Sequence, residues 1–151
     1  MESAALPTET AEHHCPRCHG AVFLNRWFAS GDIPCPHCRQ LLWFVCKPVE
    51  GAIVLTLLPG LMAGSESMQR FDEIAAAAAG AVRVIVDLSQ VRLVTSMVLR
   101  MLVLLHKRIN QSGGTLRLCG VSSDGEEVFR VTKLDTVFGS YADEEAARLS
   151  P

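Results

Sequence analysis

Two copies of a Cys-Pro-x-Cys motif constrain the fold of this chain more than any other feature. The copies lie at residues 15–18 and 35–38, with sixteen residues between Cys18 and Cys35. Each short turn presents two thiolates to one side, and two facing turns complete a tetrahedral set of ligands. This spacing is typical of sites that hold one metal ion through four cysteines. We therefore predict one structural Zn2+ ion, with the ligands Cys15, Cys18, Cys35 and Cys38.

The segment around these motifs, residues 13–45, resembles the zinc-ribbon family. It departs from that family in one detail, because His19 and Arg39 stand where ribbons often have glycine after the second cysteine. Four thiolates leave no open position for a catalytic water, so the site is expected to be structural. Aromatic residues, including Trp43 and Phe44, are expected to form the small core of this ribbon.

A thiol redox protein is the alternative reading of the same cysteines. The sequence Cys35-Pro36-His37-Cys38 is similar to the redox pair of some thioredoxin-like oxidases. Such a pair begins a helix that follows a strand, and the helix end acidifies one thiol. Here residues 40–44 are expected to form a strand, and a second cysteine pair is available. These two differences favour zinc.

Composition and charge exclude several other classes. Hydrophobic residues make up 49% of the 151 residues, so the chain can bury a core. The net charge is −2, and residues 1–48 hold four basic and four acidic residues, which argues against nucleic acid as the main partner without excluding it. The polar start is unlike a signal peptide, and Arg100 interrupts the longest apolar run, so no membrane segment is expected. We expect a cytoplasmic protein.

The second half of the chain alternates strand and helix signals. Apolar, β-branched runs predict strands at residues 52–58, 82–87 and 115–119, and helical signals follow at 65–79, 97–111, 126–132 and 144–149. Alternation at this spacing predicts an α/β fold with a mixed, largely parallel sheet covered by helices. Residues 46–51 are expected to be a connector because they contain Pro48 and Gly51. The expected organisation is a flexible tail at 1–12, a zinc ribbon at 13–45 and a separately folding domain at 46–151.

This second part resembles the STAS family, the domain of anti-sigma-factor antagonists. The resemblance rests on the order and spacing of residues 84–89, 91–96, 113–118, 131–138 and 141–146. It implies a protein-binding function that a partner kinase can switch by phosphorylating a serine within an Asp-Ser-x-Gly motif. Ser96 matches that serine, whereas Thr95 replaces the aspartate and Val98 replaces the glycine. Alternatively, Ser96 serves only to cap the helix.

The helix after Ser96 is apolar on more than one face, and part of this surplus suggests a partner surface. The candidate surface residues are Thr95, Met97, Val98, Arg100 and Leu104. The sequence shows no nucleophile–base set and no phosphate-binding glycine loop, so we expect no enzyme. The expected function is a non-enzymatic signalling or scaffold protein, whose partner is an anti-sigma factor, a related kinase or another STAS-containing protein.

Overall fold

The structure is a computed structural model, and it describes residues 13–16, 18–22, 33–35, 37–39, 41–49, 52–58, 67–91, 94 and 96–149. The predicted flexible tail at residues 1–12 lies outside the described residues. The strands are β1 (His13–His14), β2 (Ala21–Val22), β3 (Ile33–Pro34), β4 (Leu41–Leu42), β5 (Phe44–Val49), β6 (Ala52–Leu57), β7 (Arg83–Asp87), β8 (Thr115–Cys119) and β9 (Gly139–Tyr141). The helices are α1 (Ser67–Ala78), α2 (Ser96–Gln111), α3 (Ser123–Val131) and α4 (Glu144–Leu149), with a 3-10 turn η3 (Leu134–Thr136).

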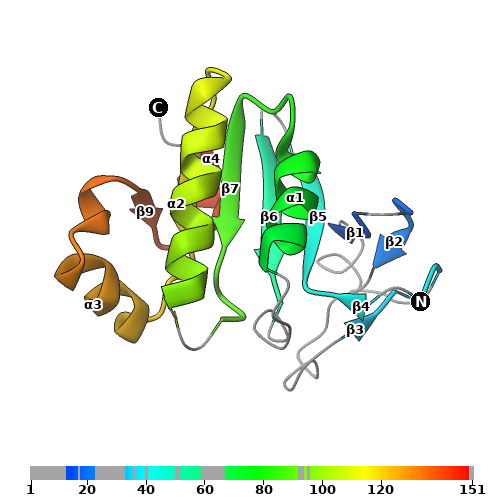
Figure 1. Cartoon of the computed structure of the whole chain (residues 1–151), viewed down its shortest axis with the longest axis horizontal. Coiled ribbons are helices and arrows are strands. Elements are labelled where there is room, and N and C mark those ends of the chain that lie inside the picture. The colour runs from blue at the N-terminus through cyan, green and yellow to red at the C-terminus, as the bar shows by residue number, and fades with distance from the viewer. Residues whose placement is uncertain are drawn as a thin grey trace, which may run out of the picture.

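One sheet runs through both parts of the described chain, in the order β2-β1-β5-β6-β7-β8-β9 (Figure 1). The strands β6, β7, β8 and β9 pair in parallel, as βαβ crossovers require. The strands β2, β1, β5 and β6 pair antiparallel. A separate small sheet contains β3 and β4. The mixed, largely parallel sheet expected from the sequence is therefore confirmed.

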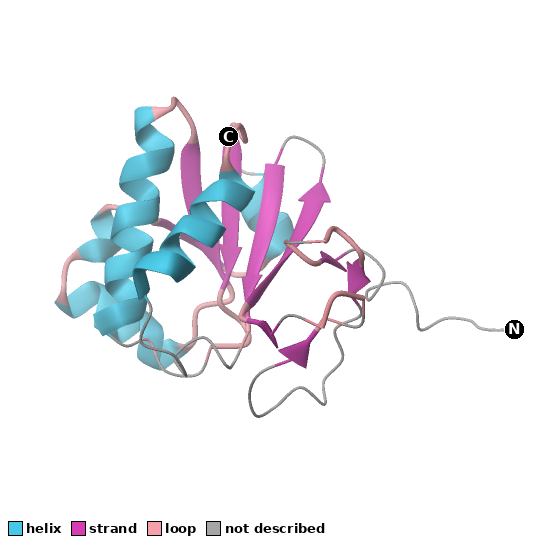
Figure 2. Ribbon diagram, turned by 45° about the vertical axis from the view of Figure 1, so that its right-hand side comes forward, coloured by secondary structure: helices cyan, strands magenta, loops and turns pink. Residues whose placement is uncertain are grey.

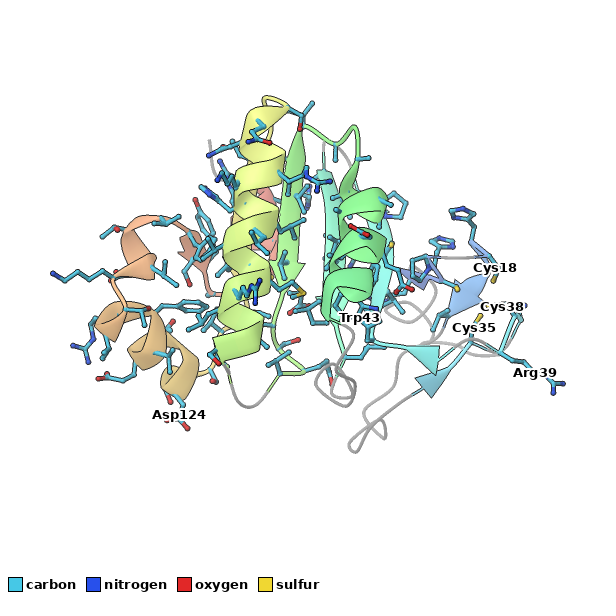
Figure 3. The ribbon with its side chains drawn as sticks, in the orientation of Figure 1. Cys18, Cys35, Cys38, Arg39, Trp43 and Asp124 are labelled. Atoms are coloured by element: carbon cyan, nitrogen blue, oxygen red, sulfur yellow. The ribbon has the colours of Figure 1, made fainter. Side chains whose placement is uncertain are left out.

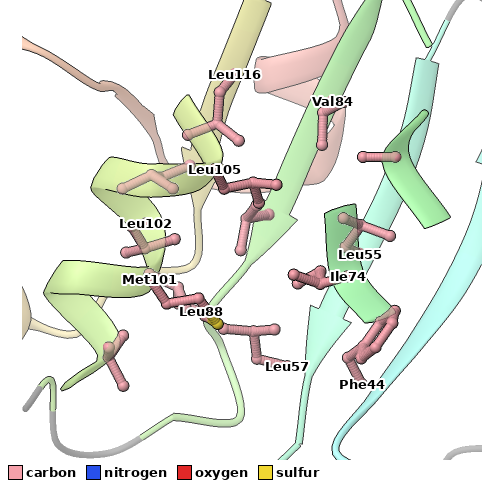
Figure 4. Packing of buried hydrophobic residues seen from close by; sticks show 14 of the residues in the cluster. Phe44, Leu55, Leu57, Ile74, Val84, Leu88, Met101, Leu102, Leu105 and Leu116 are labelled. Atoms are coloured by element: carbon pink, nitrogen blue, oxygen red, sulfur yellow. The ribbon is translucent and has the colours of Figure 1, made fainter. Parts of the chain in front are cut away.

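The main hydrophobic core lies between one face of this sheet and helices α1 and α2 (Figures 2 and 4). Successive residues of β7 alternate between the two faces, so Val84 and Val86 enter this core whereas Ile85 faces the opposite side. On that opposite side Ile85 packs with Ala147 of α4. In α2 the buried residues recur with helical spacing: Val98, Met101, Leu102, Leu105 and Ile109.

The structure corrects the expected connector at residues 46–51. Residues 44–49 form strand β5, which pairs with β6 along its whole length, and Pro48 stands opposite Ile53. Proline is tolerated near a sheet edge when its nitrogen faces away from the neighbouring strand. In the described part of the chain, β5 meets β1 only where Cys46 pairs with His14. The expected boundary at residues 45 and 46 therefore falls inside a strand.

Two further expectations are wrong in detail. Trp43 and Phe44 belong to the main core with α1 and α2, and not to a separate ribbon core, because Phe44 begins β5 and Trp43 directly precedes that strand. Helix α3 begins at Ser123, three residues before the expected start, because the hydroxyl of Ser122 accepts a hydrogen bond from the Gly125 N–H at 3.0 Å. This capping bond fixes the first turn.

Candidate metal centre and partner surface

The two Cys-Pro-x-Cys motifs fold into the same tight turn. The carbonyl of Cys15 accepts a hydrogen bond from the N–H of His19 at 2.9 Å, and the carbonyl of Cys35 accepts the equivalent bond from Arg39 at 2.9 Å. His19 and Arg39 have φ angles of 64° and 65°. These left-handed values explain why zinc ribbons favour glycine at this position, since glycine adopts them without a side-chain penalty.

The turns bring the four sulfur atoms together, all within 4.8 Å of one another. The Sγ atoms of Cys15 and Cys38 are 3.8 Å apart, and those of Cys18 and Cys35 are 3.6 Å apart. Zinc–sulfur bonds of about 2.3 Å in a tetrahedron place sulfur atoms about 3.8 Å apart, so the cluster fits such an ion. Figure 3 shows three of these cysteines converging beyond the edge of the main sheet.

Buried and exposed thiols alternate in this cluster. Cys15 and Cys35 are buried, whereas Cys18 and Cys38 are exposed. Burial opposes ionisation of the Cys35 thiol, but hydrogen bonds from the backbone N–H groups of Cys38 and His37, together with the thiols of Cys18 and Cys38, lower its pKa to about 6. Such a thiol is readily available as the thiolate that a metal requires.

His37 joins the two turns without belonging to the cysteine cluster. Its Nε2 atom lies 3.0 Å from the carbonyl oxygen of Ala21, which accepts a hydrogen bond from the Nε2–H tautomer. The imidazole ring also covers Gly20, where an added Cβ would lie 2.4 Å from the ring atom Cδ2. A methyl group at position 20 would therefore displace the His37 ring, which connects the second turn to Ala21 after the first.

The substitution Gly20→Ala is expected to weaken metal binding by about tenfold or more, because it displaces His37 and with it the turn that carries Cys35 and Cys38. Competition with a metal chelator measures this affinity. The double variant Gly20→Ala, His37→Ala removes the ring that the new methyl group meets, and it should recover much of the loss. Equal affinities for wild type and Gly20→Ala would contradict this role of His37.

The cysteine cluster is attached to the main sheet by packing as well as by backbone pairing. Cys15 and Cys35 form a buried cluster with Val22 of β2, Val45 of β5 and Leu58. Just before β5, the Trp43 indole N–H donates a hydrogen bond of 2.8 Å to Oε1 of Glu73 on α1 (Figure 3). The cysteine cluster, β5 and α1 are therefore connected through direct contacts.

A groove of about 660 Å³ lies where the first cysteine turn, β5 and α1 meet. Its lining includes His14 and His19, the edge residues Cys46 and Pro48, and Glu73 of α1. Burial raises the pKa of the Cys46 thiol to about 11, so this cysteine is un-ionised near neutral pH. Sequence reasoning missed this groove because three elements distant in sequence build it.

The candidate residues around Ser96 divide between surface and core. Ser96 is exposed at the start of α2, and Arg100 is exposed one turn later. Val98 is 1% exposed and belongs to the main core, and Leu104 is half-buried against the same core. Thr95 and the side chain of Met97 lie outside the described residues. Within the described part of the chain, Ser96 and Arg100 are therefore the accessible members of the candidate surface.

None of the helices within the described residues has the length and hydrophobicity needed to cross a bilayer.

In comparisons with known proteins, the family model for the STAS domain matches residues 46–147. The match begins after the four-cysteine cluster. A search of curated proteins gave no match.

Several solved structures have a similar fold. An anti-sigma-factor antagonist (STAS) domain protein from Planctomyces limnophilus is 28% identical, with a TM-score of 0.60, and the alignment covers 70% of this chain and 95% of that one. An anti-sigma factor antagonist from Mycobacterium paratuberculosis is 18% identical over 70% of this chain and 89% of that one, with a TM-score of 0.58. A chain of the stressosome, described as a signal integration and transduction hub, is 16% identical over 68% and 91%, with a TM-score of 0.61. The last two show similarity of fold alone.

Proposed function

Because the chain belongs to the STAS domain family, we propose that it is a non-enzymatic signalling protein of the cytoplasm that binds a protein partner through the start of α2. The family match carries this proposal, and the exposure of Ser96 and Arg100 at one end of α2 supports it. The partner would be an anti-sigma factor, a related kinase or another STAS-containing protein.

We assign a structural Zn2+ ion to the four-cysteine cluster as the second part of the proposal. The sulfur distances of 3.6 and 3.8 Å support this ion, and so does the repeated turn geometry of the two motifs. Cysteine thiolates are ligands that zinc favours in closed structural sites. One zinc ion per chain by elemental analysis of the purified protein would support it. Metal-free protein that retains its native fold would contradict it.

Phosphorylation of Ser96 is the proposed switch of partner binding. A phosphate at this position would lie at the amino-terminal end of α2, where the helix dipole favours negative charge. The same phosphate would place about two negative charges on the surface that the partner contacts. The fold should therefore persist while the interface weakens. The first turn of α2 holds no acidic residue, and the positive charge of Arg100 one turn later should attract the phosphate.

The substitution Ser96→Asp is expected to lower partner affinity by about tenfold, which corresponds to about 1.4 kcal/mol. The partner is first identified by affinity capture of the full chain from its native cells, followed by mass spectrometry. Affinities are then measured for wild type, Ser96→Ala and Ser96→Asp. The capping alternative instead predicts three equal affinities, with Ser96→Ala costing about 1 kcal/mol of stability. Ser123 is an exposed serine at the start of α3, so the substitution Ser123→Asp is the matched control for the added charge.

A further inference from the structure

Each exposed thiol of the cluster lies beside a buried thiol of the other turn. Exposed Cys18 lies 3.6 Å from buried Cys35, and exposed Cys38 lies 3.8 Å from buried Cys15. An exposed sulfur can meet a reagent from solvent, and a buried sulfur beside it can react only with its neighbour. This arrangement provides an accessible thiol and a resolving thiol in each pair.

We propose that this cluster is an oxidation site for hydroperoxides, at which Cys18 reacts first and Cys35 completes a disulfide between the two turns. The two turns already hold the sulfur atoms of Cys18 and Cys35 3.6 Å apart, so a small approach would bring them to bonding distance. Backbone N–H groups also hold both of these sulfurs, since Gly20 donates to Cys18 at 3.4 Å and His37 donates to Cys35 at 3.4 Å. The proposal rests on the zinc site but is independent of the role of Ser96.

The reaction has two steps. The Cys18 thiolate attacks one oxygen of hydrogen peroxide, the O–O bond breaks, and hydroxide leaves while Cys18 becomes a sulfenic acid. The Cys35 thiolate then attacks the sulfur of that sulfenic acid, an S–S bond forms, and a second hydroxide leaves. Two thiolates lose two electrons in total, and one hydrogen peroxide molecule accepts them. A zinc ion held by the four thiolates would keep its oxidation state but lose two of its ligands, so it would be released.

The other two cysteines provide matched controls. Cys119 is buried at the end of β8, and Cys46 is half-buried in β5. Neither belongs to the four-cysteine cluster. The full chain carrying both Cys46→Ser and Cys119→Ser should therefore react as the unmodified chain does, and it simplifies the disulfide pattern.

The test adds hydrogen peroxide to this zinc-loaded chain and follows released zinc with a chromogenic chelator. We expect one zinc ion per chain to be released by about one equivalent of peroxide, as the two-electron balance requires. Trypsin cuts after Arg17, Arg26 and Arg39, so Cys15 lies in residues 1–17, Cys18 in 18–26 and both remaining ligands in 27–39. The expected product is peptide 18–26 joined to peptide 27–39, with fragmentation locating the bond at Cys35. Disulfides within a single turn, or retention of zinc, would overturn the proposal.

Two histidine substitutions distinguish the two cysteine pairs. Both Cys18→His and Cys38→His keep four zinc ligands, because a Cys3His set also forms closed structural sites. Cys18→His should slow the peroxide-driven release of zinc by about tenfold, since it removes the first thiol to react. Cys38→His should leave the rate within about twofold of the unmodified chain. Equal slowing in both variants, or slowing only in Cys38→His, would overturn the assignment to Cys18 and Cys35.

Discussion

Removal of zinc is expected to lower the melting temperature of the whole described chain, including the helices that lie far from the metal in sequence. Zinc binding supplies on the order of 10 kcal/mol to the folding of small zinc modules. Here β1 pairs with β5, and Cys15 and Cys35 pack on Val45, so part of that energy supports the main sheet. Each kcal/mol moves the melting temperature of a chain of this size by about 2–4 °C, and we expect a fall of about 10 °C or more.

Circular dichroism at 222 nm measures this effect because the described helices all lie at or beyond Ser67. The signal therefore reports on the part of the chain that is distant in sequence from the cysteines. Chelated protein is compared with zinc-loaded protein, and zinc is added back as the control. An unchanged helical transition after chelation would show that residues 46–151 fold separately, as expected from the sequence alone. One folding unit is our proposal from the continuous sheet.

The substitution Phe44→Ala is expected to cost about 3–5 kcal/mol of unfolding free energy. Phe44 is fully buried in the main core, and its ring meets that of Trp43 at a centroid distance of 4.7 Å. The cavity would open beneath α1, whose residue Ile74 lies in the same core (Figure 4). Denaturant unfolding measures the loss. Val131→Ala, at a position that is 68% exposed, is the control and should change stability by less than about 0.5 kcal/mol.

The number of zinc ions bound per chain is a second measurement on the Phe44→Ala variant. If Phe44 belongs to the main core, the folded variant should still bind one zinc ion per chain. If Phe44 instead formed the core of a separate ribbon, the variant would lose metal while the helical transition stayed in place. Loss of zinc with an unchanged transition would therefore restore the assignment made from the sequence.

Sequence reasoning succeeded where a local pattern determines the structure. The run at residues 115–119 is bounded by glycines, and it forms β8 with the expected limits. The cysteine spacing predicted which four side chains meet, because each tight turn depends on neighbouring residues alone. The unusual residues His19 and Arg39 were visible in the sequence, and their positive φ angles follow from the same turn.

Sequence reasoning failed where tertiary contacts override a local signal. Pro48 indicated a connector, but pairing with β6 holds it in a strand. Phe44 follows the cysteine motifs closely in sequence, yet β5 directs it toward α1. The strands β1 and β2 contain two residues each, which is too short for any periodicity. From the sequence, Val98 was a candidate surface residue of α2. Only the position of the helix on the sheet shows that its side chain is buried.

The short strands around the cysteine turns also affect how the molecule meets its neighbours. A six-residue strand such as β5, with Phe44, Val45 and Val49 along it, would be a template for intermolecular pairing if it formed the border of the sheet. In the described chain β1 pairs with it at Cys46, and Pro48 beyond that point has no N–H to donate. The described sheet instead ends in the two-residue β2 and the three-residue β9. Next to the cysteine turns, the border of the described sheet is therefore a two-residue strand, which offers little backbone for pairing with another chain.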